Sequence, residues 1–195
     1  MYKNILIIGA ARSGKTTLAK RIVKEKGYSL ISIDDIVSGF EAFPELEIHH
    51  HGNAVETSKR LAPFLIKYLT ELSEGSTFYG GIKSVIEGTH FDFEQLIPFL
   101  QSDKYKEKYQ IIGLTFNDIT KKQLYDYIKK YDTADDWTYW CNDKELKDNV
   151  KNFVDRNKYF NEMFKKYGIT TFDTSFNREK VLSDIINNLE ELENG

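Results

Sequence analysis

The sequence contains few cysteines, prolines and arginines, and it has no long apolar run. Its single cysteine, Cys141, excludes an internal disulfide and a cysteine-based zinc cluster, in agreement with a reducing compartment. No stretch approaches the roughly 18 consecutive apolar residues that a transmembrane helix needs. A net charge of −3 gives no basic surface of the kind that nucleic-acid-binding proteins usually carry. We therefore predict a cytoplasmic protein whose partners are small molecules, and neither nucleic acid nor a membrane.

The composition is that of a globular chain, with 41% hydrophobic and 29% charged residues among 195. A chain of this length can bury a substantial core, and we expect one domain over residues 1–195. Apolar runs alternate with segments of helical periodicity, which favours an α/β fold in which helices cover both faces of a parallel sheet. The five strand candidates are residues 5–8, 28–33, 84–86, 109–116 and 169–173.

Residues 9–16 read Gly-Ala-Ala-Arg-Ser-Gly-Lys-Thr and fit the phosphate-loop motif G-x-x-x-x-G-K-[ST]. The motif stands between a strand candidate and a helical pattern, so a chance glycine-rich turn is the weaker interpretation. Glycines let the backbone fold around a phosphate chain, and amide groups at the helix N-terminus point at the anion. We expect a nucleoside triphosphate to be bound by Gly9, Ala10, Ala11, Arg12, Ser13, Gly14, Lys15, Thr16 and Thr17.

Two side chains of the motif have specific expected roles. Lys15 would reach the β- and γ-phosphates, and the Thr16 hydroxyl would be a ligand of Mg²⁺. ATP and Mg²⁺ are therefore the cofactors that we predict.

Carboxylates follow two other strand candidates. Ligands of open parallel α/β sheets bind at the carboxyl ends of the strands, so Asp34, Asp35 and Glu87 should lie near the phosphate loop. Asp34 or Asp35 could accept the proton of a substrate hydroxyl, and Glu87 could hold a water bound to Mg²⁺. The ordinary alternatives are a capped helix with an acidic first turn for the pair and a simple turn acid for Glu87.

With these motifs the chain resembles the P-loop small-molecule kinases of the nucleoside-monophosphate-kinase and shikimate-kinase type. The resemblance is carried by residues 9–16, 31–35 and 85–88, of which only the phosphate loop is specific. It implies a three-layer α/β/α fold with a five-stranded parallel sheet in the order 2-3-1-4-5. It also implies an acceptor-binding segment at about 38–74, a helical lid at about 131–156, and an adenine-framing loop that includes Thr174, Ser175 and Arg178.

The predicted lid departs from the better-known members because it is poor in arginine. Such lids usually supply guanidinium groups to the transferring phosphoryl group, and the whole chain has five arginines. Arg156 is the best placed for a catalytic role, although a solvated helix charge paired with an acid is an equal alternative. Arg60 could hold an anionic group of the acceptor, or it could be an ordinary surface residue. His90 is a further candidate for acceptor binding, as is Asp35.

Two other clusters allow competing interpretations. The aromatic residues of 137–140 could close over a base or sugar, but we expect them to pack the lid against the body, because large aromatic side chains most often bury area. The triplet His49, His50 and His51 resembles a metal site, but adjacent loop residues rarely converge on one ion, so we expect solvated or substrate-facing histidines.

The sequence thus predicts ATP- and Mg²⁺-dependent phosphoryl transfer to a small acceptor, which could be a nucleoside or nucleotide, a sugar or a hydroxy acid. Toxin-type kinases that act on nucleotide sugars fall within this prediction. The alternative is a nucleotide-binding regulatory or NTP-hydrolysing switch with a macromolecular partner. Residues 114–118 lack the Asn-Lys-x-Asp element of guanine-specific switches, which disfavours a GTPase.

Overall fold

Five parallel strands form the centre of the computed structural model, which describes residues 3–75, 81–117 and 119–189. The strand order is β2-β3-β1-β4-β5, and every neighbouring pair is parallel, as predicted. The strands are β1 (Asn4–Gly9), β2 (Ser29–Ser32), β3 (Ser84–Gly88), β4 (Tyr109–Thr115) and β5 (Thr171–Asp173). Because parallel strands need crossover connections, the chain between them is largely helical.

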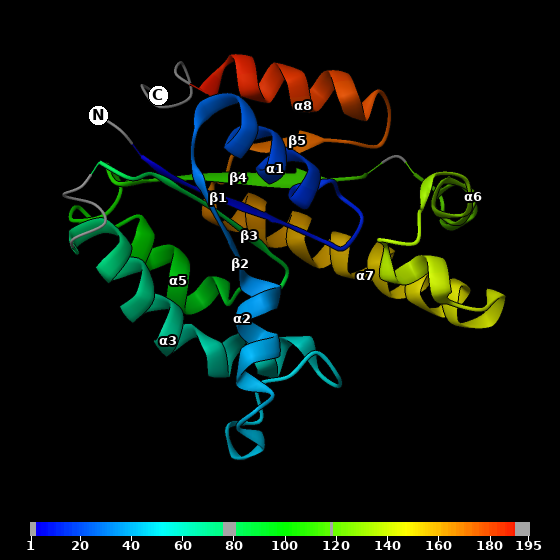
Figure 1. Ribbon diagram of the computed structural model, residues 1–195, viewed down its shortest axis with the longest axis horizontal. Coiled ribbons are helices and arrows are strands. Elements are labelled where there is room, and N and C mark those ends of the chain that lie inside the picture. Colours follow the sequence, from blue (N-terminus) through cyan, green and yellow to red (C-terminus); the bar gives the residue numbers. More distant parts are fainter. Residues whose placement is uncertain (1–2, 76–80, 118, 190–195) are drawn as a thin grey trace.

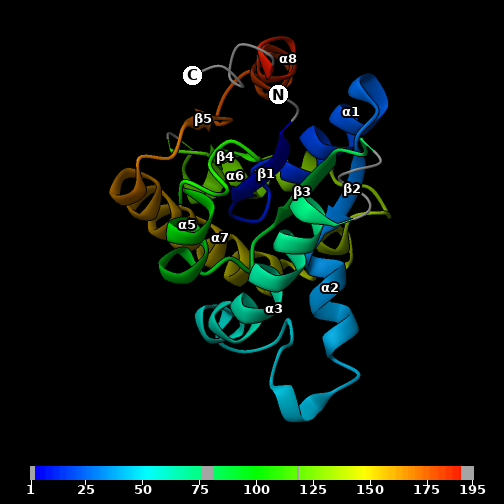
Figure 2. The same ribbon diagram turned by 90° about the vertical axis from the view of Figure 1, so that its left-hand side faces the viewer.

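Helices cover both faces of this sheet, which gives the three-layer α/β/α fold that we predicted. Figures 1 and 2 show α1 and α8 on one face and α3, α5 and α7 on the other. The bounds are α1 (Lys15–Lys26), α3 (Ala54–Glu74), α5 (Phe93–Leu100), α7 (Asp143–Tyr167) and α8 (Arg178–Asn187). Two further helices, α2 (Ile33–Phe40) and α6 (Lys121–Tyr131), lie toward the carboxyl ends of the strands.

The central strand β1 is buried on both sides, as parallel sheets require. Leu6 and Ile8 pack into the core under α3, α5 and α7, while Ile5 and Ile7 pack into the core under α1 and α8. This apolar packing holds the phosphate-binding end of β1 in the middle of the sheet.

The start of α2 differs from the sequence prediction. We expected a strand over residues 28–33, whereas β2 ends at Ser32 and α2 follows at once. The Ser32 hydroxyl accepts a hydrogen bond from the Asp35 amide at 3.2 Å, and two acids occupy the first turn. Both features stabilise a helix N-terminus, so the helix begins as soon as the strand ends.

A buried asparagine joins α7 to the end of β4. Asn157 accepts a hydrogen bond from the Phe116 amide at 3.1 Å and donates one to the Phe116 carbonyl at 3.3 Å. Helix α7 is thereby fixed beside the carboxyl edge of the sheet. In the part of the chain that the structure describes, no helix has both the length and the apolar character to cross a membrane.

Candidate active site at the carboxyl edge of the sheet

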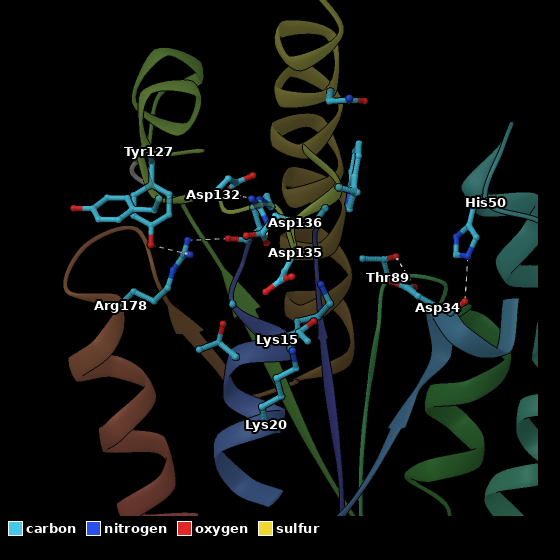
Figure 3. Close-up of a pocket in the computed structure, with 18 of the residues that line it drawn as sticks. Lys15, Lys20, Asp34, His50, Thr89, Tyr127, Asp132, Asp135, Asp136 and Arg178 are labelled. Carbon is cyan, nitrogen blue, oxygen red and sulfur yellow. Dashed lines mark hydrogen bonds and ion pairs between the residues drawn. The ribbon is translucent and has the colours of Figure 1, made fainter. Parts of the chain in front are cut away.

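A cavity of about 1040 Å³ opens at the carboxyl edge of the sheet, above the end of β1. Its walls come from the phosphate loop and α1, the start of α2, the loop before α3, the residue after β3, α6, α8 and the segment between α6 and α7 (Figure 3). The side chains that matter for its chemistry are Arg12, Lys15, Thr16, Asp34, His50, His51, Thr89, Tyr127, Tyr131, Asp132, Asp135, Asp136, Trp137 and Arg178.

The phosphate loop needs its glycines for two different reasons. A Cβ at Gly9 would lie 2.4 Å from the Leu114 carbonyl oxygen, so only glycine lets the loop leave β1 this close to β4. Gly14 adopts a φ of +96° immediately before α1, a conformation that side chains rarely allow. The loop therefore delivers its amides to the N-terminus of α1, as a phosphate site requires.

The Lys15 ammonium group lies inside this loop. Its side chain is buried, and Nζ donates a hydrogen bond to the Ala10 carbonyl at 3.0 Å. Burial lowers the pKa of Lys15, while attraction to Glu87 and Asp34 acts in the opposite direction. A cation partly desolvated in this way interacts strongly with an anion that enters the loop.

Glu87, near the end of β3, is 4% exposed, and its carboxylate interacts with Lys15 and Thr16 of the phosphate loop although it does not line the cavity. Burial raises its pKa, and the nearby charge of Lys15 and a hydrogen bond with Thr16 partly counteract this. Its Oε2 atom has no hydrogen-bond partner among the described residues. The Thr16 hydroxyl and this carboxylate offer the oxygen chemistry that Mg²⁺ prefers, so the residues present fit the predicted metal.

Asp34 and Asp35 have different environments although they are neighbours in sequence. Asp34 lines the cavity and accepts a hydrogen bond from the Thr89 hydroxyl at 3.3 Å. Asp35 is exposed, does not line the cavity, and its amide takes part in the cap of α2. The structure therefore brings Asp34, and not Asp35, to the site.

Two histidines line the cavity together with Asp34, and a third is buried next to one of them. His50 and His51 line the cavity, and His50 Nε2 is 3.0 Å from Ser38 Oγ and 3.1 Å from the Asp34 carbonyl oxygen. His90 is buried behind them, with its ring 5.4 Å from that of His50. Within the described ranges no three acidic, histidine or cysteine side chains are placed to hold a metal ion. The cavity-facing position of His50 and His51 agrees with the substrate-facing alternative.

The two arginines considered for the acceptor are placed very differently. Arg156 is mostly buried, its guanidinium stacks over Tyr159 and Phe160, and Nη2 donates to the Thr89 carbonyl at 3.4 Å. It has no carboxylate partner among the described residues, which is not the arrangement of a solvated surface pair. Arg60 forms an ion pair with Glu47, is half exposed and does not line the cavity. The structure does not bring Arg60 to the site.

The loop after β5 contributes one residue of the three that we predicted. Thr174 is buried and donates to the Ser13 and Thr115 carbonyls, both at 2.9 Å, so it fixes the phosphate loop to the sheet. Ser175 binds the Asp173 carboxylate, and neither residue lines the cavity. Arg178 does line it, and donates to the Arg12 carbonyl at 2.8 Å.

Sequence reasoning missed Tyr127 and Tyr131, which line this side of the cavity from α6. The Arg178 guanidinium lies 4.6 Å from the Tyr127 ring centroid and donates to the Tyr127 hydroxyl at 3.2 Å. The spacing of four residues between the tyrosines places them on one face of a helix and was the available signal.

The segment between α6 and α7 was expected to pack its aromatic residues against the body, and this expectation was wrong. Trp137, Tyr139 and Trp140 are 57%, 54% and 72% exposed. Trp137 lines the cavity and makes a T-shaped ring contact with Phe153. A short 3₁₀ helix over Trp137–Trp140 turns these rings outward, because polar contacts rather than apolar burial hold the segment.

A phosphate loop that follows the first strand of a parallel sheet in the order 2-3-1-4-5 is the arrangement of the P-loop small-molecule kinase fold. No family model and no curated protein matches the sequence. Among solved structures, a gluconokinase from Sinorhizobium meliloti 1021 matches with a TM-score of 0.63 and 11% identity, over 98% of this chain and 94% of that chain. A shikimate kinase from Acinetobacter baumannii in complex with shikimate matches with a TM-score of 0.59 and 15% identity, again over 98% and 94%.

The shikimate kinase from Aquifex aeolicus vf5 also matches, with a TM-score of 0.53 and 17% identity over 98% of this chain and 99% of that chain. At these low identities the TM-scores show a shared fold alone. Function follows from the site itself.

Proposed function

We propose that this protein transfers the γ-phosphoryl group of ATP to a hydroxyl group of a small molecule, with Mg²⁺ as cofactor. The observation that carries the proposal is that one cavity contains both the phosphate loop with Lys15 and the carboxylate of Asp34. Phosphoryl transfer requires little beyond positioning and charge stabilisation, and these groups supply both. The cytoplasmic location and the absence of nucleic-acid and membrane partners stay predictions.

The nucleotide half of the site is formed by the loop, α1, α6 and α8. Phosphates in the loop would replace the Ala10 carbonyl as the partner of Lys15, and Thr16 and Glu87 would hold the metal. Bound Mg²⁺ would neutralise charge on the β- and γ-phosphates. Tyr127 and Tyr131 offer aromatic faces to the base on the side where Arg178 lies.

The acceptor half would be formed by Asp34 at the start of α2, by His50 and His51 in the loop before α3, and by Thr89 after β3. Of these residues, His50 and His51 fall within the predicted acceptor segment 38–74. Asp34 is the base that would receive the hydroxyl proton, and its bond with Thr89 orients the carboxylate. His50 and His51 border the same space. Arg156 does not line the cavity, but its guanidinium lies behind Thr89 and has no carboxylate partner among the described residues. Its positive charge would favour an acceptor with an anionic group, such as a hydroxy acid.

The test is ADP release from ATP and Mg²⁺ in the presence of panels of nucleosides, nucleotides, sugars and hydroxy acids. We expect one class to stimulate ADP release, and Lys15→Ala to abolish both stimulation and tight ATP binding. Lys24→Ala, in the exposed last turn of the same helix, is the matched control and should behave like the wild type. Hydrolysis that no acceptor stimulates would support a nucleotide switch instead.

A further inference from the structure

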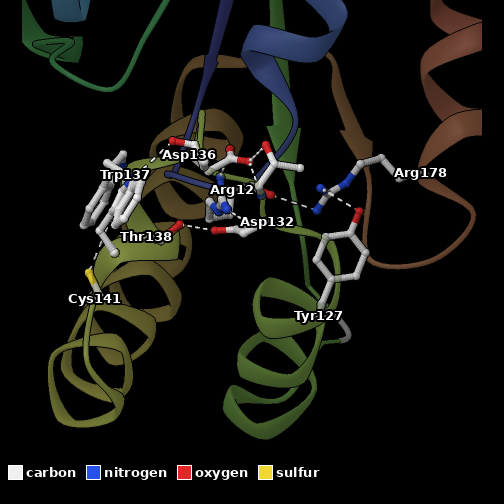
Figure 4. Close-up of polar contacts among 11 residues, drawn as sticks. Arg12, Tyr127, Asp132, Asp136, Trp137, Thr138, Cys141 and Arg178 are labelled. Carbon is white, nitrogen blue, oxygen red and sulfur yellow. Dashed lines mark hydrogen bonds and ion pairs between the residues drawn. The ribbon is translucent and has the colours of Figure 1, made fainter.

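The Arg12 guanidinium lies between two carboxylates of the segment that borders the phosphate loop, residues 132–136, which we call the acidic cover (Figure 4). Nη2 pairs with Asp132, and Nη1 lies 2.9 Å from Asp136 Oδ1. The Arg12 side chain is 18% exposed and that of Asp132 only 7%. The contact with Asp136 spans 124 positions in the sequence, so it fastens the cover to the phosphate loop.

The backbone of Arg12 adopts a conformation that glycine would tolerate better than arginine. Its φ is +70°, in the left-handed region that is unfavourable for a residue other than glycine. Glycine at this position would avoid the strain and still form the loop. A side chain that occupies such a position needs interactions that offset the strain, and functional sites are where these outliers gather.

The groups around the Arg12 guanidinium have partners of their own, so the guanidinium is the group that can change partners. Arg178 fixes the Arg12 carbonyl at 2.8 Å. Within the cover, Asp132 accepts a hydrogen bond from Thr138, and Asp136 Oδ2 accepts one from the Thr133 amide at 3.1 Å. Both carboxylates therefore have a second partner besides Arg12, and the cover contains no arginine of its own.

The charges of the cavity conflict with a bound triphosphate. Asp132, Asp135 and Asp136 line the same space as Arg12 and Lys15, and carboxylates this close repel phosphate oxygens. A guanidinium fork binds phosphate as well as carboxylate, with two parallel hydrogen bonds. A nucleotide that enters the loop thus competes with the cover for Arg12.

We propose that Arg12 exchanges its carboxylate partners for the phosphate chain when ATP binds, and that this exchange releases the acidic cover. The phosphate loop then supplies from its own sequence the guanidinium that the cover lacks. The inference rests on the proposed function, because it requires a nucleoside triphosphate in this loop. It adds a phosphate-binding role for the Arg12 side chain and a coupling between nucleotide binding and the position of residues 132–136.

The experiment is isothermal titration of the full chain with ATP and with adenosine. The variants are Arg12→Gly, which also relieves the backbone strain, the pair Asp132→Asn and Asp136→Asn, and all three changes together. We expect Arg12→Gly to weaken ATP binding about tenfold, the loss of one charge-assisted contact, and to leave adenosine binding unchanged. Asp132→Asn together with Asp136→Asn should tighten ATP binding. The gain should be larger in the wild-type background than in the Arg12→Gly background.

Thermal melting confirms that each variant is folded, and Arg12→Lys, which keeps the charge but loses the fork, should fall between wild type and Arg12→Gly. If Asp132→Asn with Asp136→Asn tightens ATP binding equally with and without Arg12→Gly, the two carboxylates only repel the phosphates, and the proposed exchange is overturned. The exchange is also overturned if Arg12→Gly lowers the affinities for ATP and for adenosine equally, because Arg12 would then act only by holding the segment in place. If the wild type binds ATP and Lys15→Ala does not, failure of the Arg12 result refutes this inference alone. A wild type that binds no ATP refutes the proposed function as well.

Discussion

Thr89 donates its hydroxyl hydrogen to the Asp34 carboxylate, with Oγ1 3.3 Å from Oδ1. This bond joins the residue that follows β3 to the first turn of α2 at the wall of the cavity. The next residue, Asp35, is exposed and lies outside the cavity lining. Asp34 and Asp35 carry the same charge, so a comparison of their variants separates the effect of position in the cavity from the effect of charge.

Asp34→Asn should lower kcat for acceptor phosphorylation by about 10²–10⁴-fold, the usual contribution of a general base, and leave ATP affinity within a few-fold of wild type. Steady-state kinetics with the acceptor found in the panel, together with ATP titration, measure both. Asp35→Asn changes the same charge one position away and should retain wild-type kcat. Equal losses in the two variants would show that charge near α2, and not the Asp34 carboxylate, matters.

Gly88 determines how closely α2 approaches β3. A Cβ at this position would lie 2.5 Å from Ile33 Cβ, at the start of the helix that carries Asp34. Gly88→Ala should therefore displace α2, destabilise the fold by about 1–3 kcal/mol as overpacked cores do, and lower kcat. Urea unfolding and acceptor kinetics are the measurements.

Gly39 is the matched control for this substitution, because it lies on α2 and a Cβ there meets no atom within 4 Å. Gly39→Ala should keep activity and stabilise the protein by about 0.4–1 kcal/mol, since alanine narrows the unfolded ensemble. A Gly88→Ala variant as stable and active as Gly39→Ala would contradict the proposed close approach.

His90 makes stability depend on pH. Burial lowers its pKa, and His50 and Arg156 act in the same direction, while Asp34 acts against them. The folded protein therefore takes up the His90 proton less readily than the unfolded chain. The stability that neutral His90 contributes is complete above pH 6.5, its ordinary pKa, and is lost as pH falls toward the lowered value.

His90→Gln cannot take up this proton, so its free energy of unfolding should decline less than that of the wild type between pH 7.5 and 5. Urea titrations at several pH values give the two curves. His51→Gln, in which an exposed histidine is replaced, should follow the wild type. Parallel curves for wild type and His90→Gln would show that burial of His90 is not linked to protonation.

Local sequence determined the phosphate loop and the architecture around it. Glycines at 9 and 14 permit the backbone conformation of the loop, and alternation of apolar runs with helical patterns led to the parallel sheet. The order of the strands came from resemblance to a kinase type, and the structure confirms it. The phosphate loop and the alternation of strands and helices depend on residues that are close together in the sequence, so local patterns are enough to predict them.

Tertiary structure decided which side chains reach the cavity. Successive residues of a helix point about 100° apart, so the choice between Asp34 and Asp35 depends on how α2 packs. Arg60 forms its ion pair with Glu47 and does not reach the cavity. Arg12 forms its ion pairs with the carboxylates of the acidic cover. Partners this distant in sequence meet only through packing of the whole chain, because a side chain's direction is set by the element that carries it and by what that element packs against.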